Sequence, residues 1–187
     1  MTIRVILQPA GGTEARKHLW TLRDGIDLNK LSARLRDHLG VLQKEHPTGV
    51  AHAWGLTPGK SDVNSGKWDR IQRGDVVLFA GQGHLFAWAS VTHKMRSKLL
   101  ATTLWGVDNR GQTWEYVYFV REPQALTVSY ARLAGALGYK RTFRIQGVIV
   151  LGEAQSVHLL ETLNLHRDEQ GPAAKTKRLK ITRLPPP

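Results

Sequence analysis

Two apolar runs with a short glycine-bounded break between them constrain the fold of this chain more than any other feature. Residues 75–80 and 84–91 are rich in valine, leucine, phenylalanine and alanine, and Gly81-Gln82-Gly83 joins them. The pattern predicts a β-hairpin with a glycine-dependent turn. Because neither run alternates cleanly with polar residues, both strands are expected to be largely buried.

Strand and helix signals lie on both sides of this hairpin. Further strands are predicted at residues 2–8, 50–56, 114–120 and 141–152. Leucines at helical spacing predict a helix that begins with Asp27 as its N-cap and ends at Gly40, and shorter helices are predicted at 130–138 and 154–166. Residues 57–67 are predicted to form a long loop, and residues 92–104 a basic segment that crosses between strands.

The order of these elements indicates the fold class. Strands outnumber helices and mostly follow one another as antiparallel neighbours, which favours a mixed α+β domain built on a small β-barrel over a doubly wound sheet. We expect one such domain over residues 1–170. From residue 171 onward the composition is basic and ends in three prolines, which predicts an extended linker or tail at 171–187.

The charge balance and the missing cysteines narrow the function. The chain has 27 lysines and arginines against 15 acidic residues, a formal net charge of +12, so a polyanion such as nucleic acid is the natural partner. With no cysteine, a disulfide framework and a thiolate metal site are excluded. The apolar N-terminal stretch stops at Pro9 and no run reaches the length of a membrane span, so a cytoplasmic location is expected.

The usual catalytic patterns are missing. Residues 55–61 resemble a phosphate-binding P-loop, but the segment is one residue short and has Pro58 where backbone donors are needed. The eight histidines are scattered without metal-ligand spacing, and neither a nuclease core nor a nucleophile elbow is present. We therefore expect no catalytic residues, no metal and no cofactor in this chain.

Tryptophan is concentrated in the middle of the sequence. Five of the six lie among lysines and arginines between residues 54 and 114, namely Trp54, Trp68, Trp88, Trp105 and Trp114. A flat ring stacks on any nucleobase and neighbouring cations follow phosphates, so this pattern is typical of a site that holds an unstacked base. Packing in the core is the alternative for each ring. It is favoured for Trp88 and Trp114, which lie inside strand-like runs.

The sequence resembles the EVE/YTH-like branch of the PUA superfamily in three segments that occur in the same order as in that branch. They are residues 53–60, 67–91 and 104–123. The most specific part combines Trp68, Ile71, Gly74, Asp75, Val77 and Phe79 with the hairpin and then Leu104-Trp105-Gly106. The resemblance covers about residues 50–123 and is closest to the N-terminal modified-cytosine readers of modification-dependent restriction enzymes. It implies a six-stranded barrel with helices around it and a pocket for a flipped base.

The resemblance also implies site residues. By position, the stacking walls would be Trp54 and Trp105, facing one another, with Trp88 as a further pocket residue. Arg110 stands where the YTH branch has another cage aromatic, so modified cytosine in DNA is favoured over N6-methyladenosine. Asp108 and Asn109 are candidates to meet the Watson–Crick edge of the cytosine, and turn formation is the alternative for this pair.

Basic residues around these motifs are candidates for phosphate contacts: Lys60, Lys67, Arg70, Arg73, Lys94, Arg96, Lys98 and Arg110. For each of them a solvated surface charge is the alternative. The sequence thus predicts a recognition domain that flips 5-methyl- or 5-hydroxymethylcytosine out of duplex DNA, with a nuclease or GTPase effector domain in the same protein or complex. The alternatives are a PUA-like module for structured or modified RNA, and a small enzyme acting on nucleic acid.

Overall fold

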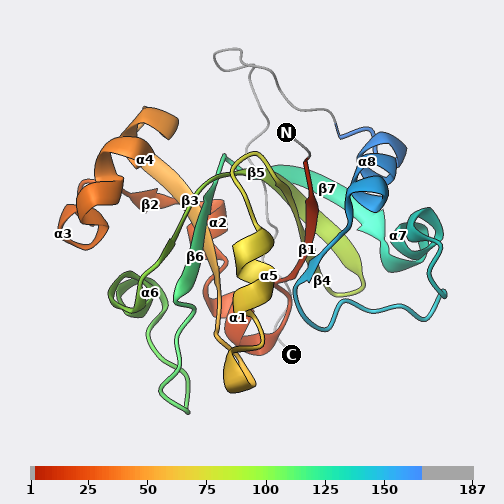
Figure 1. The fold of residues 1–187 in the computed structure, drawn as a ribbon, viewed down its shortest axis with the longest axis horizontal. Coiled ribbons are helices and arrows are strands. Elements are labelled where there is room, and N and C mark those ends of the chain that lie inside the picture. The colour runs from red at the N-terminus through yellow and green to blue at the C-terminus, as the bar shows by residue number, and fades with distance from the viewer. Residues whose placement is uncertain (1–2, 166–187) are drawn as a thin grey trace.

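A computed structural model describes residues 3–165 of the chain, and within them eight strands form one strongly curved sheet (Figure 1). The strands are β1 (Val5–Pro9), β2 (Ile26–Asp27), β3 (Val50–Leu56), β4 (Val76–Gly81), β5 (His84–Arg96), β6 (Tyr116–Val120), β7 (Gln124–Ser129) and β8 (Ile149–Val150). Their order is β2-β3-β6-β5-β4-β1-β8, with β7 paired to β5 beside this path. Only β2 and β8 are as short as two residues, so six longer strands build the sheet.

Helices surround this sheet. They are α1 (Thr13–Lys17), α2 (Trp20–Arg23), α3 (Ser32–Leu35), α4 (Leu39–Glu45), α5 (Ser65–Arg70), α6 (Lys98–Trp105), α7 (Tyr130–Leu137) and α8 (Glu153–Thr162), with 3-10 turns η1 (Arg36–His38) and η2 (Lys60–Asp62). In Figure 1, α3, α4 and α6 lie on one side of the sheet and α7 and α8 on the other. The predicted mixed α+β class is confirmed.

None of the helices between residues 3 and 165 combines the length and the apolar character needed to cross a lipid bilayer. The predicted tail at 171–187 lies outside the described residues.

Strand β5 joins the two halves of the sheet. Its first half pairs with β4 and β7, and its second half, from Val91 to Arg96, pairs with β6. The register shifts between Val91 and His93 on the β6 side, and such irregularities bend a strand and increase its twist. The bend lets one strand serve both halves, so the sheet curls toward a barrel.

The predicted hairpin is confirmed as β4 and β5. Its turn residues Gln82 and Gly83 both have positive φ, at 52° and 81°, as a type I′ connection requires. The strands predicted at 2–8, 50–56 and 114–120 correspond to β1, β3 and β6, and the helices predicted at 130–138 and 154–166 correspond to α7 and α8. Local sequence signals were sufficient for these elements.

The continuous helix predicted from Asp27 to Gly40 is wrong. Asp27 ends β2, the chain turns at Arg36 with φ 42°, and Gly40 lies inside α4 rather than after a helix. The leucine spacing reflects burial across several short elements, because Leu28 and Leu35 are fully buried, whereas Leu31 and Leu39 are only partly buried.

Two further sequence predictions need correction. Residues 92–104 do not cross between strands, because they form the end of β5 and most of α6. The strand predicted at 141–152 contains only the two residues of β8, and β7 was not predicted. Both β7 and β8 form by pairing with strands distant in sequence, so local pattern does not define them.

Strand β3 separates two hydrophobic clusters. Trp54 and Leu56 face the interior of the curled sheet, whereas Ala51 and Ala53 face the cluster that contains residues of α3, α4 and α6. Successive residues of a strand point to opposite faces. Gly55 therefore lies on the α6 side, where an added Cβ would sit 2.6 Å from the Trp114 carbonyl oxygen and 2.8 Å from Cζ3 of Trp105.

This close approach predicts that Gly55→Ala destabilises the domain. Overpacking typically costs about 1–3 kcal/mol, and backbone, which cannot move aside cheaply, is among the atoms that the methyl group would meet. Urea unfolding measures the loss. The matched control is Gly135→Ala within α7, where an added Cβ meets nothing within 4 Å and stability should stay constant or rise by up to about 1 kcal/mol. Equal stabilities of the two variants would contradict this packing.

Candidate nucleic-acid interface

The two predicted stacking walls lie on opposite faces of β3. Trp54 is 3% exposed and packs edge-on against Phe79, with ring centroids 6.1 Å apart. Trp105, at the end of α6, is 7% exposed and belongs to the other cluster, where it approaches Gly55. The prediction that the rings of Trp54 and Trp105 face one another across an open pocket is therefore wrong, because neighbouring strand residues point in opposite directions.

Trp88 does not join either ring. It lies on β5 and packs against a third cluster that includes residues of α7 and α8. The structure therefore does not bring half-buried Trp88 together with Trp54 or Trp105, and its contacts fit the core-packing alternative.

A partly open aromatic site does occur next to Trp105. The half-buried ring of Trp114 packs edge-on against Trp105, at 6.4 Å between centroids, and against His18 on its other side, at 4.8 Å. His18, at the end of α1, is also only partly buried. These three residues, Trp105, Trp114 and His18, are called the indole cluster below. The strand-like run around Trp114 predicts packing, because such a run gives no information about which face of the ring stays open.

Two buried polar atoms beside this cluster have no hydrogen-bond partner within residues 3–165. They are Nε1 of Trp105 and Oγ1 of Thr113, which stand at the two ends of the loop between α6 and β6. Nearly all buried polar groups are paired in folded proteins, and leaving one unpaired costs about 1–3 kcal/mol. Both atoms are closed to solvent in this structure, so a ligand reaches them only when the side chains around them move.

His18 contributes an uncharged ring. Its partial burial lowers its pKa, an effect that the neighbouring Lys17 reinforces and Glu14 opposes. The imidazole is therefore mostly neutral at pH 7, and it stands edge-on to the Trp114 ring, at 68° between the ring planes, without adding a charge.

The loop of residues 106–112 uses Asp108 for its own structure. The Asp108 carboxylate accepts hydrogen bonds from the backbone N–H groups of Arg110, at 2.9 Å, and Gln112, at 2.8 Å. The turn alternative therefore describes Asp108, whereas Asn109 beside it is exposed. A role of Asp108 in holding cytosine would require it to give up these two bonds.

Several predicted phosphate ligands already have protein partners. Lys94 donates to the carbonyl oxygens of Trp68, at 3.0 Å, and Asp69, at 3.1 Å, and lies 4.3 Å from the centre of the Trp68 ring. Arg96 forms a 2.6 Å ion pair with Glu115. These contacts stabilise α5 and the β5–β6 pair, so the two cations serve the fold.

Three more candidates are engaged in a similar way. Arg73 pairs with Glu45 of α4, Arg70 donates to a backbone carbonyl of β8, and Lys67 donates to the side chain of Asn64, which precedes α5. Exposed ion pairs contribute little stability, but they reduce the positive charge that remains available to a phosphate.

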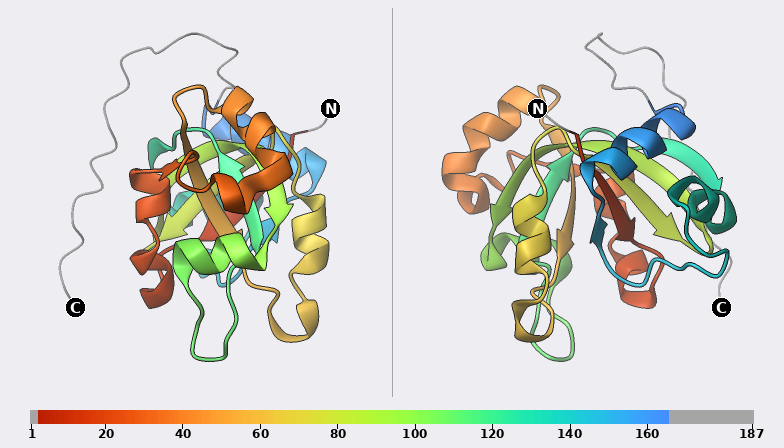
Figure 2. Two further views of the ribbon diagram at one scale, coloured as in Figure 1. Left: turned by 90° about the vertical axis from the view of Figure 1, so that its left-hand side faces the viewer. Right: turned by 45° about the vertical axis from the view of Figure 1, so that its right-hand side comes forward.

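Lys60, Lys98 and Arg110 remain exposed, with no ion pair or side-chain hydrogen bond to the part of the chain that the structure describes. Lys60 lies in η2, Lys98 begins α6, and Arg110 lies in the loop of residues 106–112. Figures 1 and 2 show that α1, η2 and this loop reach the same end of the molecule. The indole cluster therefore lies at the end of the molecule where Lys60 and Arg110 are exposed.

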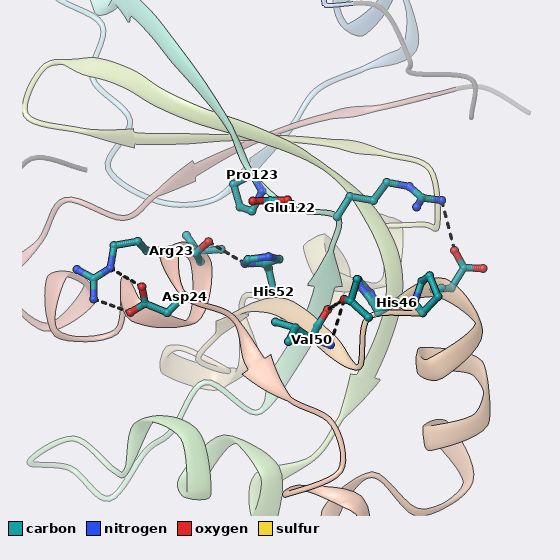
Figure 3. A pocket seen from close by; sticks show the side chains of 12 residues that line it. Arg23, Asp24, His46, Val50, His52, Glu122 and Pro123 are labelled. Carbon is teal, nitrogen blue, oxygen red and sulfur yellow. Dashed lines mark hydrogen bonds and ion pairs between the residues drawn. The ribbon is translucent and has the colours of Figure 1, made fainter. Parts of the chain in front are cut away.

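A separate cavity of about 620 Å³ lies at the other end of the β3–β6 pair (Figure 3). Buried His46 and His52 line it, together with charged residues from the end of α2, from α4 and from the segment after β6. His52 Nδ1 lies 2.9 Å from the Leu22 carbonyl, and His46 Nε2 lies 2.9 Å from Thr92 Oγ1. No local sequence pattern indicates this cavity, because its walls come from segments far apart in the chain.

Within residues 3–165 no group of three or more histidine, aspartate or glutamate side chains is arranged to hold a metal ion. The two cavity histidines have hydrogen-bond partners in the protein instead.

Comparison with known proteins supports the fold. Neither a protein-family model nor a curated protein matches the sequence. The structure is similar to the N-terminal domain of Thermococcus gammatolerans McrB bound to m5C DNA, with a TM-score of 0.61 and 16% identity over 86% of this chain and 97% of that chain. The NMR structure of Rpa0253 from Rhodopseudomonas palustris matches with a TM-score of 0.42 and 13% identity over 90% and 99% of the two chains. The first likeness confirms the predicted fold.

The cavity histidines predict a pH-dependent stability. Burial, reinforced by the positive charge of His52 and Arg121, lowers the pKa of His46 to about 4. Between that value and the unfolded value of about 6.5, the unfolded chain binds the additional proton, so stability falls as the pH falls. From pH 7 to pH 5, His46 should reduce the free energy of unfolding by about 2 kcal/mol.

Urea unfolding of the wild type and of His46→Gln at the two pH values measures this effect. The variant should lose clearly less stability than the wild type on acidification. His158→Gln, which alters an exposed histidine of α8, serves as the control and should behave like the wild type. An unchanged pH dependence in His46→Gln would contradict the assignment.

Proposed function

We propose that this chain recognises modified cytosine in duplex DNA and receives the flipped base at the indole cluster. The observation that carries this proposal is the partly open Trp114–His18 pair beside two unpartnered buried polar atoms, at the end of the molecule where Lys60 and Arg110 are exposed. The fold shared with a domain bound to m5C DNA supports it, as does the net charge of +12.

The indole cluster offers groups that suit a cytosine. A flipped base would stack on the ring of Trp114, with neutral His18 at its edge. The Nε1–H of Trp105 is a donor for the cytosine O2 or N3, and the Thr113 hydroxyl is able to accept from the N4 amine. Both atoms are buried and unpaired in the free domain, so a base edge would relieve their cost.

Approximate energies indicate how much base stacking, polar contacts and the methyl group would each contribute to the affinity. Extracting a base costs a few kcal/mol, and stacking on an aromatic ring returns about 1–3 kcal/mol. Satisfying a buried polar atom returns about 1–3 kcal/mol more. One buried methyl group adds only about 0.8 kcal/mol, about a four-fold preference, so stronger discrimination requires a closely fitted wall around the C5 position.

Basic residues would hold the duplex while the base is extracted. Each phosphate contact adds to the salt dependence of binding without adding sequence specificity. In this proposal the chain supplies recognition, and the effector step belongs to a nuclease or GTPase domain in the same protein or complex.

Fluorescence anisotropy with four matched probes tests the function. The probes are a duplex with one 5-methylcytosine, its unmodified and 5-hydroxymethylcytosine counterparts, and an RNA duplex of the same sequence. We expect at least one modified duplex to bind several-fold more tightly than the unmodified one. Equal affinity for all DNA probes would contradict modified-base reading, and tighter binding to the RNA would favour the RNA-binding alternative.

The site is tested by Trp114→Ala. Loss of about 1–3 kcal/mol of stacking should reduce the affinity for the modified duplex about five-fold or more, while nonspecific binding to unmodified DNA stays similar. The matched control is Trp88→Ala, which removes another half-buried tryptophan from a different cluster and should keep the preference. Thermal melting verifies that both variants are folded. Retained preference in Trp114→Ala would place the base elsewhere.

A further inference from the structure

The loop of residues 106–112 projects from the end of the molecule that carries the indole cluster. In Figures 1 and 2 it extends beyond the strands as a narrow hairpin-like excursion between α6 and β6. Its ends are the residues that carry the unpartnered buried atoms, Trp105 and Thr113. Any DNA that places a base against Trp114 must therefore lie next to this loop.

Internal hydrogen bonds hold the loop in one shape. Besides the two bonds to the Asp108 carboxylate, the Asp108 N–H donates to the Gln112 carbonyl at 2.7 Å, and the Gly111 N–H donates to the Asp108 carbonyl at 3.0 Å. Gly111 has φ of 71°, a conformation that glycine adopts without strain. The loop therefore presents its tip in a fixed position, without an ordering cost on binding.

The tip exposes groups of three different kinds. Val107 is 54% exposed, and Asn109 and Arg110 are exposed beside it. The Asp108 carboxylate is turned back onto the loop backbone, which leaves the arginine as the charge that a partner meets at the tip. This combination of an apolar side chain, a carboxamide and a guanidinium suits a gap between stacked bases, which offers both apolar surface and hydrogen-bonding groups. A site that binds only the DNA backbone phosphates needs cations alone.

Flipping a cytosine creates such a gap. Its guanine partner stays in the stack with O6 and N7 as acceptors and with N1–H and the N2 amine as donors without partners. An arginine donates to O6 and N7, and an asparagine carboxamide is able to accept from N1–H or the N2 amine. Apolar side chains commonly fill the space between separated base steps.

We propose that the loop of residues 106–112 is a DNA-penetrating finger whose Asn109 and Arg110 bind the guanine left unpaired opposite the flipped cytosine. The inference rests on the proposed function and adds a second specificity site to it. Asp108 is a positioning residue of this finger, because its carboxylate fixes the backbone of Arg110.

Contacts to the base on the opposite strand would let the protein distinguish 5-methylcytosine from thymine, which the indole cluster alone would not do. Thymine carries the same C5 methyl group as 5-methylcytosine, so a pocket that fits the methyl group accepts both shapes. Thymine pairs with adenine, which has an N6 amine where guanine has O6. Arg110 would meet a donor there instead of an acceptor, so the finger would reject a flipped thymine through its partner base.

A protein–DNA double-mutant cycle tests the finger. One duplex has 5-methylcytosine opposite guanine, and the other has it opposite an abasic site, which removes the guanine but keeps the modified base. Arg110→Ala should weaken binding to the first duplex about five-fold or more, the lower end for an arginine–guanine contact, and leave binding to the second almost unchanged. Asn109→Ala should show the same pattern with a smaller loss.

Arg132→Ala is the charge-matched control, because Arg132 is exposed on α7 on another side of the molecule. It should change the affinities for both duplexes equally. Equal weakening of both duplexes by Arg110→Ala would overturn the finger and leave Arg110 as a phosphate ligand, although the preference for modified DNA would persist. An absence of that preference in the wild type would instead reject the proposed function itself.

The positioning role of Asp108 has its own pair of variants. Asp108→Ala removes both hydrogen bonds that the carboxylate accepts from the loop backbone. Although Arg110 is still present, this variant should reduce the difference in affinity between the duplex with guanine and the duplex with the abasic site. Asp108→Asn keeps an acceptor oxygen and should retain most of it. Equal behaviour of the two variants would show that the loop does not depend on these bonds, and the idea of a preformed finger would fail.

Discussion

The close approach of Gly55 to Trp105 and Trp114 is the contact on which the site depends. Strand β3 alternates its side chains between two clusters, so Trp54 lies inside the curled sheet while Gly55 faces α6. Without a side chain at Gly55, the Trp105 ring comes within 2.8 Å of the position that a Cβ would occupy. Trp114 can then pack beside Trp105 and keep part of its own ring open. The placement of the two tryptophan rings thus depends on this backbone position.

Features that depend on neighbouring residues were predictable from the sequence. The Gln82-Gly83 turn and α7, which ends at Gly138 with φ of 68°, follow from local backbone preferences. Features that depend on distant partners were not predictable. Trp54 and Trp105 both stand beside glycine, and no local pattern shows that β3 and α6 bury them in different clusters. Trp114 was assigned to packing for a similar reason, because its exposure is determined by how α1 places His18 against it.

The distribution of charge shows a similar limit. A net charge of +12 indicates a polyanionic partner, but it does not identify the contacts. Lys94 and Arg96 differ from Lys60 only in what the fold brings near them, namely the carbonyls at the end of α5 and the carboxylate of Glu115. Cations that stabilise the domain are less available for DNA. Among the phosphate ligands predicted from the sequence, the exposed ones without partners lie in η2, α6 and the loop before β6. Other exposed basic residues, such as Arg34, Lys44 and Arg132, lie on α3, α4 and α7, so available charge is not confined to the end of the molecule that carries the indole cluster.

The two ends of the β3–β6 pair satisfy their polar groups differently. At the cavity end, His46 and His52 are buried and each has a hydrogen-bond partner. At the other end, Trp105 Nε1 and Thr113 Oγ1 are equally buried and have none within residues 3–165. Unpaired buried groups destabilise a free domain by about 1–3 kcal/mol each, and conflicts of this kind tend to occur at functional sites. A ligand with a polar edge offsets that cost, whereas a purely apolar ligand of the same shape does not. Under the proposed function, the two unpaired atoms would favour a ligand with a polar edge over an apolar one. Nε1 of Trp68 is likewise buried and unpaired within residues 3–165 but lies in another cluster, so an unpaired atom alone does not mark a binding site.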